Sequence, residues 1–265
     1  GPCYSGTTRV FPPAPAQQCT MEQIDLERLP LATYEDLAQL IDHSLVRPEL
    51  TDADIHAGCQ LAREYGVKSV SVRPSDVDTA VRALQGTSVI VGAVVGFPHG
   101  STTAAVKNYE AREVIRKGAR EIDMVLNVGK LRSRQFLYIE NELGQLAETC
   151  REHGVVLKVI LENSLLTTEL KTVACRILTR VQADFAKTAS GFAPGGCTEE
   201  DLRLMRAECG PNVRIKAAVG IRTLEAALKA YQLGADRIGA TQTGTILDEW
   251  KSRLAQTADT AAAES

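Results

Sequence analysis

Short runs of β-branched and other apolar residues recur along the chain, and longer amphipathic stretches separate them. Eight runs have the length and composition of buried strands. They cover residues 40–44, 67–72, 88–96, 121–127, 155–162, 183–188, 213–219 and 235–240. Because strands that alternate with helices form parallel sheets, eight such units most simply close into a (β/α)8 TIM barrel, a single α/β domain. The alternative is an open doubly wound sheet, but no glycine-rich dinucleotide fingerprint follows the first strand.

Threonine and glycine residues mark the ends of the helices predicted between these strands. Thr51 and Thr198 are suited to helix N-caps, and Thr198 stands in capping-box spacing with Asp201. Four of the predicted helices end at glycines: Gly66, Gly118, Gly210 and Gly234.

The two ends of the chain differ from this pattern. Residues 1–32 contain prolines without periodicity, so we expect a flexible N-terminal arm. Its first two residues, Gly1 and Pro2, are of the kind that a protease leaves after removing a tag. Residues 33–254 form the predicted barrel domain, and the small polar residues 255–265 predict a disordered tail.

Composition excludes several classes of protein. The net charge of −3 gives no electrostatic basis for binding nucleic acid or an anionic membrane. No apolar run approaches the length of a membrane span. The seven cysteines are odd in number and lack metal-finger spacing, so we expect reduced thiols in a cytoplasmic protein without a structural metal.

Polar and ionisable residues occupy several predicted strands where a buried strand normally carries Val or Ile. These residues are Asp42, His43, Asp123, Asn127, Lys158, Glu162, Lys187 and Lys216. A single strand lysine often belongs to a sheet edge or reaches the surface. A closed barrel has no edge, however, so inward-pointing charges must meet near its axis, close to the carboxyl ends where barrel active sites lie.

Two lysines on neighbouring strands and an aspartate nearby suggest one type of chemistry. A free lysine has a pKa of roughly 10.4 and is a cation at neutral pH. Burial and a second cation lower that pKa, and the neutral amine then attacks a carbonyl to form a Schiff base. We expect Lys187 and Lys216 to form this pair and Asp123 to move the protons.

Glycine-bearing turns follow the last three strands, at residues 190–196, 219–223 and 239–244. Each turn leads into a predicted helix, whose free backbone N–H groups can bind an anion. Barrels often bind phosphate in the loops after their seventh and eighth strands. The turns therefore predict a phosphate site beside the two lysines.

Several stretches resemble the deoxyribose-phosphate aldolase family. They are "IDHSL", "VRPSDV", "GFPHG", "EIDMVLN", "LKVILE", "DFAKTASGF", "KAAVGIRT" and "RIGA", spread over residues 34–254. The resemblance implies a (β/α)8 barrel and a class I aldolase that reversibly cleaves 2-deoxy-D-ribose 5-phosphate to D-glyceraldehyde 3-phosphate and acetaldehyde. It also implies that Lys187 forms the Schiff base, Lys216 lowers its pKa and Asp123 transfers protons, without a metal or organic cofactor.

The resemblance also implies a set of residues that contact the substrate. They are Asp42, Ser44, Ser190, Gly191, Val219, Gly220, Thr241 and Gln242. The chain departs from the usual family pattern within this set. Val219 replaces the first glycine of a pair, Ser190 replaces a threonine, and Thr241-Gln242-Thr243 replaces a serine-containing turn. Ser71 stands where a cysteine is usual, and we expect it to lie away from the substrate.

Two alternatives remain at this stage. One is a Schiff-base lyase that uses the same residues on a different aldehyde or sugar phosphate. The other is a barrel that binds a sugar phosphate without catalysis, but such a protein would have no reason to keep two cations buried together. The expected partners are small sugar phosphate and aldehyde substrates, and we expect a homodimer because barrels of this kind often pair.

Overall fold

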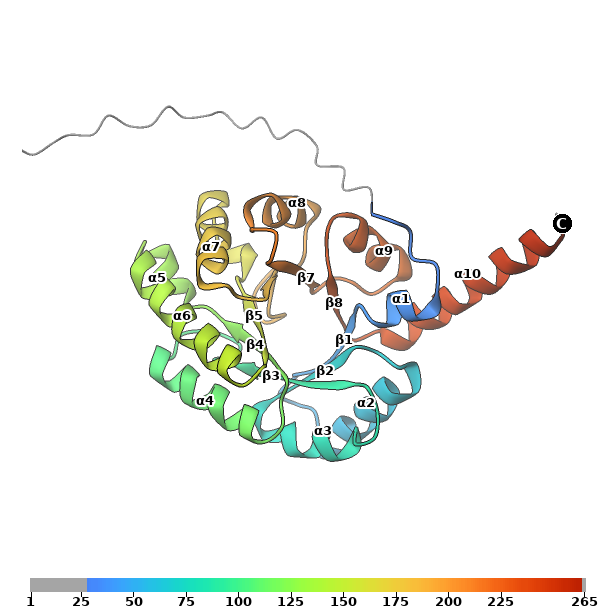
Figure 1. Ribbon diagram of the computed structural model, residues 1–265, viewed down its shortest axis with the longest axis horizontal. Helices are drawn as coiled ribbons and strands as arrows, with labels where there is room; N and C mark the ends of the chain where they lie inside the picture. Colours follow the sequence, from blue (N-terminus) through green and yellow to red (C-terminus); the bar gives the residue numbers. More distant parts are fainter. Residues whose placement is uncertain (1–27, 264–265) are drawn as a thin grey trace, which may run out of the picture.

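Eight parallel strands close into a barrel, and helices surround it (Figure 1). The computed structural model describes residues 28–263. The strands are β1 (Ile41–Leu45), β2 (Ser69–Val72), β3 (Ile90–Val95), β4 (Glu121–Val125), β5 (Val156–Ile160), β6 (Phe185–Lys187), β7 (Arg214–Ala218) and β8 (Arg237–Ala240). Each strand pairs with the next in the chain, and β8 pairs with β1. The predicted (β/α)8 barrel is confirmed, and every predicted strand overlaps an observed one.

The helices form the outer layer seen around the strands in Figure 1. They are α1 (Tyr34–Ala38), α2 (Asp52–Tyr65), α3 (Val77–Ala83), α4 (Ala104–Arg116), α5 (Val128–Arg132), α6 (Phe136–Glu152), α7 (Thr168–Val181), α8 (Glu199–Glu208), α9 (Leu224–Gln232) and α10 (Thr243–Ala263). Two short 3-10 helices, η1 (Pro74–Asp76) and η2 (Asn163–Leu165), follow β2 and β5.

The helix ends follow the local sequence signals. At the start of α2, the Thr51 side chain accepts a hydrogen bond from the backbone N–H of Asp54, whose carboxylate accepts one from the N–H of Thr51. The helix ends at Gly66, whose φ of 61° is readily adopted only by glycine. Thr198 caps α8 in the predicted way, but the Asp201 carboxylate binds Lys171 instead of closing the capping box.

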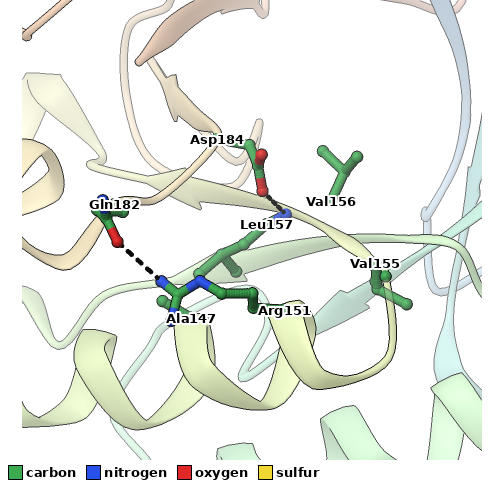
Figure 2. A pocket seen from close by; sticks show the side chains of 8 residues that line it. Ala147, Arg151, Val155, Val156, Leu157, Gln182 and Asp184 are labelled. Atoms are coloured by element: carbon green, nitrogen blue, oxygen red, sulfur yellow. Dashed lines mark hydrogen bonds between the residues drawn. The ribbon is translucent and has the colours of Figure 1, made fainter. Parts of the chain in front are cut away.

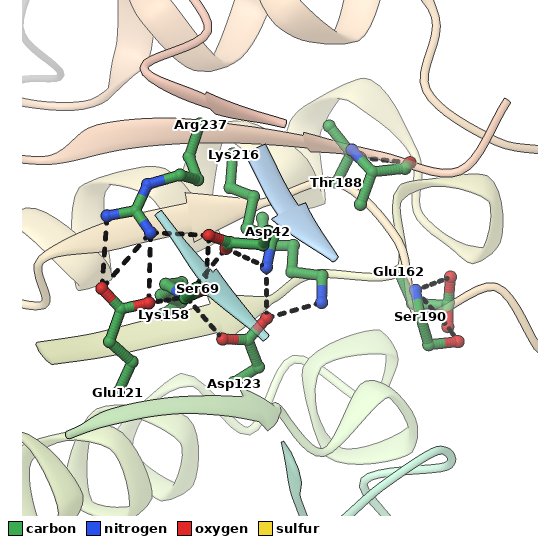
Figure 3. Close-up of polar contacts among 12 residues, drawn as sticks. Asp42, Ser69, Glu121, Asp123, Lys158, Glu162, Thr188, Ser190, Lys216 and Arg237 are labelled. Atoms are coloured by element: carbon green, nitrogen blue, oxygen red, sulfur yellow. Dashed lines mark hydrogen bonds and ion pairs between the residues drawn. The ribbon is translucent and has the colours of Figure 1, made fainter. Parts of the chain in front are cut away.

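Strand residues alternate between two environments. In β4, Ile122 and Met124 are fully buried in the apolar layer between barrel and helices. The residues that alternate with them, Glu121 and Asp123, point into the barrel (Figure 3). The apolar layer holds the barrel together, whereas the barrel interior carries charge.

Both termini lie outside the repeating barrel units. Residues 1–27 of the predicted N-terminal arm lie outside the described residues. Arg28 Nη2 lies 2.6 Å from Asp236 Oδ1, and its guanidinium lies 4.9 Å from the ring centre of Tyr231 in α9. The predicted disordered tail is instead helical as far as Ala263, because alanine favours helix and α10 only has to be extended.

Among residues 28–263, no helix combines the length and the apolar character that crossing a bilayer requires.

His43 lies on the outer side of β1, where its Nδ1 is 2.9 Å from Thr243 Oγ1 at the start of α10. The histidine therefore joins the first strand to the last helix. Burial lowers its pKa to about 4, so the ring is neutral in the folded protein at pH 7.

We predict that His43 makes the protein sensitive to acid. Between pH 6.5 and pH 4, the histidine is protonated in the unfolded chain but neutral in the folded protein. The free energy of unfolding therefore decreases as the pH is lowered through this range, by roughly 3 kcal/mol for this group. Urea unfolding at pH 7 and pH 4.5 should show a shallower pH dependence for His43→Gln than for the unmodified chain. The exposed His56→Gln variant is the control and should keep the full slope. Equal slopes for all three proteins would contradict the prediction.

Candidate active site

A cavity of about 460 Å³ opens at the carboxyl ends of the strands. Its lining comes from β1, β2, β6, β7 and β8 and from the loops that follow β1, β6, β7 and β8. The lining residues with polar or charged side chains are Asp42, Ser44, Arg47, Ser71, Lys187, Ser190, Lys216, Arg222 and Thr241. This is the end of the barrel at which the sequence predicted an active site.

Lys187 ends β6 and lies at the boundary between this cavity and the charged barrel interior. It is 7% exposed, and its Nζ donates a hydrogen bond of 2.7 Å to Asp123 Oδ2. Burial and the neighbouring charge of Lys216 lower the pKa of Lys187 to about 8, although Asp123 opposes the shift. A sizeable fraction of the amine is therefore neutral near physiological pH.

Asp123 is completely buried in the middle of β4. Its Oδ2 accepts hydrogen bonds of 2.7 Å from both Lys187 and Lys216. Oδ1 lies 3.1 Å from Lys158 Nζ, in a direction that does not make a hydrogen bond. Burial would raise the pKa of Asp123, but the charges of the three lysines hold it well below its usual range.

Lys216 in β7 bridges two carboxylates. Its Nζ lies 2.6 Å from Asp42 Oδ2 and 2.7 Å from Asp123 Oδ2. Its strand position is directly beside Lys187 in the β6–β7 register. The structure thus brings Lys187, Lys216 and Asp123 together as the sequence predicted.

Asp42 is almost completely buried, and its contacts are with other protein side chains. Its Oδ1 accepts hydrogen bonds of 2.6 Å from both Ser69 and Arg237, and its Oδ2 contacts Lys158 and Lys216 (Figure 3). Both carboxylate oxygens are therefore already engaged with the protein. Asp42 touches the cavity, but its contacts fix the charged groups of the barrel interior.

The charged interior includes residues that the sequence reasoning did not assign to the site. Arg237 and Glu121 form an ion pair beneath Asp42, with Nη1 and Oε2 3.2 Å apart. Lys158 contacts Glu121, at 2.5 Å between Nζ and Oε2. The signal for Glu121 was its spacing of two from Asp123, which places both side chains on one face of the strand. Arg237 also stands within a predicted strand.

The other predicted substrate contacts divide into two groups. Ser44, Ser190, Gly191, Val219 and Thr241 line the cavity. Gly220 and Gln242 are exposed and do not line it.

Ser190 is also part of the internal structure of its loop. Its hydroxyl and its backbone N–H both donate to the carboxylate of Glu162, and the hydroxyl accepts from the N–H of Phe192. Glu162 adopts a φ of 56°, which is uncommon for a residue other than glycine. These contacts fix the loop after β6 at the edge of the cavity.

Val219 adopts a strained backbone conformation in the turn after β7. Its φ of 75° is exceptional for a β-branched residue, because the side chain crowds the backbone there. Its carbonyl oxygen accepts a hydrogen bond of 3.0 Å from the N–H of Cys197. The turns after β6 and β7 are thereby joined at the rim of the cavity. The fold therefore imposes a positive φ on Val219, at the position where the family pattern has a glycine.

Two guanidinium groups lie at the mouth of the cavity. Arg222 follows the turn after β7, and Arg47 follows β1. The Arg47 guanidinium lies 5.0 Å from the ring centre of Phe192, which in turn packs edge-on against Phe97 at 5.3 Å. The sequence reasoning missed both arginines, although Arg222 stands within the "VGIRT" turn that it singled out.

Ser71 differs from its expected position. It is 3% exposed, it lines the cavity, and its hydroxyl has no hydrogen-bond partner within the protein. Because buried hydroxyls in folded proteins are normally paired, this group is available to a molecule in the cavity. Ser71 was not expected near the site, but it lies at this cavity because β2 faces β6 across the closed barrel.

A second cavity, of about 260 Å³, lies beside the start of β5 (Figure 2). Arg151 Nη2 lies 3.5 Å from Gln182 Oε1, and Asp184 accepts a hydrogen bond from the N–H of Leu157. These groups are occupied with one another and with the backbone. Within residues 28–263, no cluster of three or more His, Cys, Asp or Glu side chains is arranged to hold a metal ion.

The fold and the site define a class of protein. A (β/α)8 barrel that presents a lysine of lowered pKa, next to a buried carboxylate, at the end of its strands is equipped for chemistry on carbonyl compounds. Residues 36–247 match the model of the DeoC/LacD family aldolases. The chain belongs to this family.

Individual relatives agree with this assignment. The deoxyribose-phosphate aldolase of Caldanaerobacter subterraneus subsp. tengcongensis is 45% identical over 219 residues, which are 82% of this chain and 95% of the relative. That of Rhodopirellula baltica is 41% identical over 83% of this chain and 92% of its own length. The tetrameric deoxyribose phosphate aldolase of Aeropyrum pernix superimposes with a TM-score of 0.78 at 29% identity, covering 84% of this chain and 94% of that chain.

We predict that the amine of Lys187 titrates near pH 8 and that Lys216→Leu moves this midpoint upward. Loss of the neighbouring positive charge lets Lys187 keep its proton to higher pH. Labelling with acetic anhydride over a pH series, followed by peptide mass spectrometry, measures the reactivity of the amine. Labelling of Lys187 in the variant should fall sharply at pH 7 and recover at high pH.

The exposed lysine of α10 provides the control, since Lys251→Leu should leave the Lys187 profile unchanged. Unchanged labelling of Lys187 at pH 7 in Lys216→Leu would show that the second lysine does not influence the first.

Proposed function

We propose that this protein is a class I aldolase that reversibly cleaves 2-deoxy-D-ribose 5-phosphate to D-glyceraldehyde 3-phosphate and acetaldehyde. The observation that carries the proposal is the Lys187 amine, which borders the cavity, has a pKa lowered to about 8 and lies 2.7 Å from Asp123. The names of the curated relatives support the choice of substrate.

In this reaction the neutral amine of Lys187 attacks the C1 aldehyde of the open-chain sugar. Loss of water from the carbinolamine gives a protonated imine, which withdraws electrons from the neighbouring carbon. A base removes the proton of the C3 hydroxyl, the C2–C3 bond breaks, and D-glyceraldehyde 3-phosphate leaves. The remaining enamine is protonated at carbon, and water releases acetaldehyde and regenerates the amine.

Asp123 is the group placed to move these protons. Its Oδ2 is within hydrogen-bond distance of the Lys187 nitrogen, so it can exchange protons there directly or through one water molecule. Its low pKa keeps it ionised, and its basicity rises once Lys187 is neutral, because one of the three cations that lower this pKa is then gone. Lys216 holds the same oxygen and so fixes its orientation toward the reacting nitrogen.

The phosphate of the substrate is assigned to the cavity mouth. Arg222 and Arg47 supply positive charge there, and Gly191, Val219 and Thr241 line the same end. Gly220 and Gln242 flank the lining residues at the exposed rim. Ser44 lies deeper, on β1, where it can contact the sugar.

The assay of this proposal combines trapping with turnover. Incubation with deoxyribose 5-phosphate and borohydride should give one reduced adduct on Lys187, detected by intact mass and peptide mapping. Lys187→Leu should abolish both the adduct and the release of D-glyceraldehyde 3-phosphate, whereas Lys251→Leu should affect neither.

The possible results separate the alternatives. An adduct with acetaldehyde but no turnover of deoxyribose 5-phosphate would favour a Schiff-base lyase for a different substrate. Absence of any adduct from the unmodified protein would refute the Schiff-base mechanism.

We predict opposite effects of Ser71→Ala on stability and on activity. Removing an unpartnered buried hydroxyl should raise the free energy of unfolding by about 1 kcal/mol. The same change removes a hydrogen bond to an oxygen of the bound substrate, so kcat/KM should fall by roughly tenfold. Urea unfolding without substrate and steady-state kinetics measure the two effects.

The matched control is Ser69→Ala on the same strand. The Ser69 hydroxyl donates to Asp42, so its removal should lower stability. A loss of stability in Ser71→Ala, or unchanged kinetics, would count against a substrate contact for Ser71.

We further propose a cytoplasmic location and a homodimeric assembly. The described cysteines are all free thiols, as is usual for proteins in a reducing compartment. The relative from Aeropyrum pernix is described as a tetramer, so self-association occurs within the family. Sedimentation at micromolar concentration gives the assembly of this chain.

A further inference from the structure

We infer that Glu121 and Arg237 are positioning residues that set the charge state of Lys187 from beneath the cavity. Neither residue lines the cavity, and both act through the carboxylates that lie between them and the lysine. The inference deepens the proposed function, since it takes Lys187 as the reacting amine. Glu121 and Arg237 are the first residues of β4 and β8, at the end of the strands where no contact with substrate is expected.

One continuous chain of ion pairs connects Arg237 to Lys187. Arg237 Nη1 lies 2.6 Å from Asp42 Oδ1, and the other oxygen of Asp42 lies 2.6 Å from Lys216 Nζ. Lys216 lies 2.7 Å from Asp123 Oδ2, and this same oxygen accepts the hydrogen bond from Lys187. Positive and negative groups alternate along the path, which Figure 3 shows from Arg237 to Asp123.

A second branch starts at Glu121. Its Oε2 lies 2.5 Å from Lys158 Nζ, and Lys158 reaches Asp123 at 3.1 Å and Asp42 at 3.0 Å. Glu121 also pairs with Arg237, so the two branches share a common base. A change of charge at Glu121 or Arg237 therefore changes the electrostatic environment of both Asp42 and Asp123, the carboxylates that contact Lys187 and Lys216.

The count of charges in this cluster is unequal. Its cations are Lys158, Lys187, Lys216 and Arg237, and its anions are Asp42, Glu121 and Asp123. Strands β2 and β3 add no charged side chain to the interior, and Glu162 after β5 is engaged by Ser190. Arg214 at the start of β7 is exposed and lies over the ring of Phe185, outside the buried ion pairs. One positive charge is therefore unmatched when every group is ionised.

Lys187 is the cation from which a proton leaves most easily. It contacts one carboxylate, whereas Lys158 contacts three, and Lys216 and Arg237 contact two each. Loss of a proton from Lys187 leaves three cations facing three anions. Because the cluster is buried, its charges interact through a medium of low polarity and are little screened by salt.

The direction of each effect follows from this balance. Without the charge of Arg237, the cluster is neutral while Lys187 is still protonated, so the lysine keeps its proton to higher pH. Without the charge of Glu121, the cluster carries two unmatched positive charges, so Lys187 loses its proton at lower pH. A merely structural role would not produce shifts of opposite sign.

The experiment compares Arg237→Met, Glu121→Gln and the charge-preserving control Arg237→Lys. Acetic anhydride labelling of Lys187 from pH 6 to pH 10, read by peptide mass spectrometry, gives the titration midpoint without any aldolase substrate. We expect the midpoint to rise by about one pH unit in Arg237→Met, to fall by about one unit in Glu121→Gln, and to stay near the original value in Arg237→Lys. At pH 7, trapping of the acetaldehyde imine should be roughly tenfold slower in Arg237→Met.

Shifts in the same direction, or midpoints that do not move in Arg237→Met and Glu121→Gln, would overturn the inference. If circular dichroism shows that Arg237→Met is unfolded, Glu121→Gln decides alone, and an unchanged or raised midpoint refutes the inference. Opposite shifts in a protein that does not turn over deoxyribose 5-phosphate would refute the proposed function and leave the inference standing.

Discussion

The structure depends on the mutual neutralisation of charges inside a closed barrel. A buried charge is costly unless it is paired, and the interior of this barrel has no edge through which a charged side chain can reach water. Asp123 and Asp42 meet this requirement by each holding several cations at once. Lys187 is paired with one carboxylate only, fewer than any other cation of the network, and it is the reactive group.

This arrangement divides the barrel interior into two parts. The lower part, toward the amino ends of the strands, holds the buried ion pairs, and the upper part, at the carboxyl ends, forms the cavity that can admit a ligand. Below, Arg237 and Glu121 belong to the buried network and do not line the cavity that Lys187 borders. Above, the loops after β6 and β7 are joined through Cys197 and Val219, and Arg222 brings positive charge to the mouth. The strained φ of Val219 belongs to this rim, as is common where a backbone is held for binding.

Much of the fold could be predicted from the sequence because the patterns that specify it are local. Apolar runs of strand length, threonine N-caps and glycine ends depend on residues a few positions apart, and every predicted strand was found. Lys187, Lys216 and Asp123 could also be selected as candidates, because a charged residue inside an apolar strand is conspicuous in the sequence, and the structure places them in contact. The tail was misjudged because its alanines continue a helix that begins far upstream.

By itself, the sequence determined the eight strand–helix units, the charged and polar residues within the strands, and the family resemblance. Only the tertiary structure decided which of these side chains meet. Closure of the barrel brings β2 opposite β6, so Ser71 faces the cavity. Closure likewise places Arg237 against Asp42, although 195 positions separate them. Such contacts arise from the stagger of strands around a ring, a geometric property of the whole sheet that no local pattern encodes.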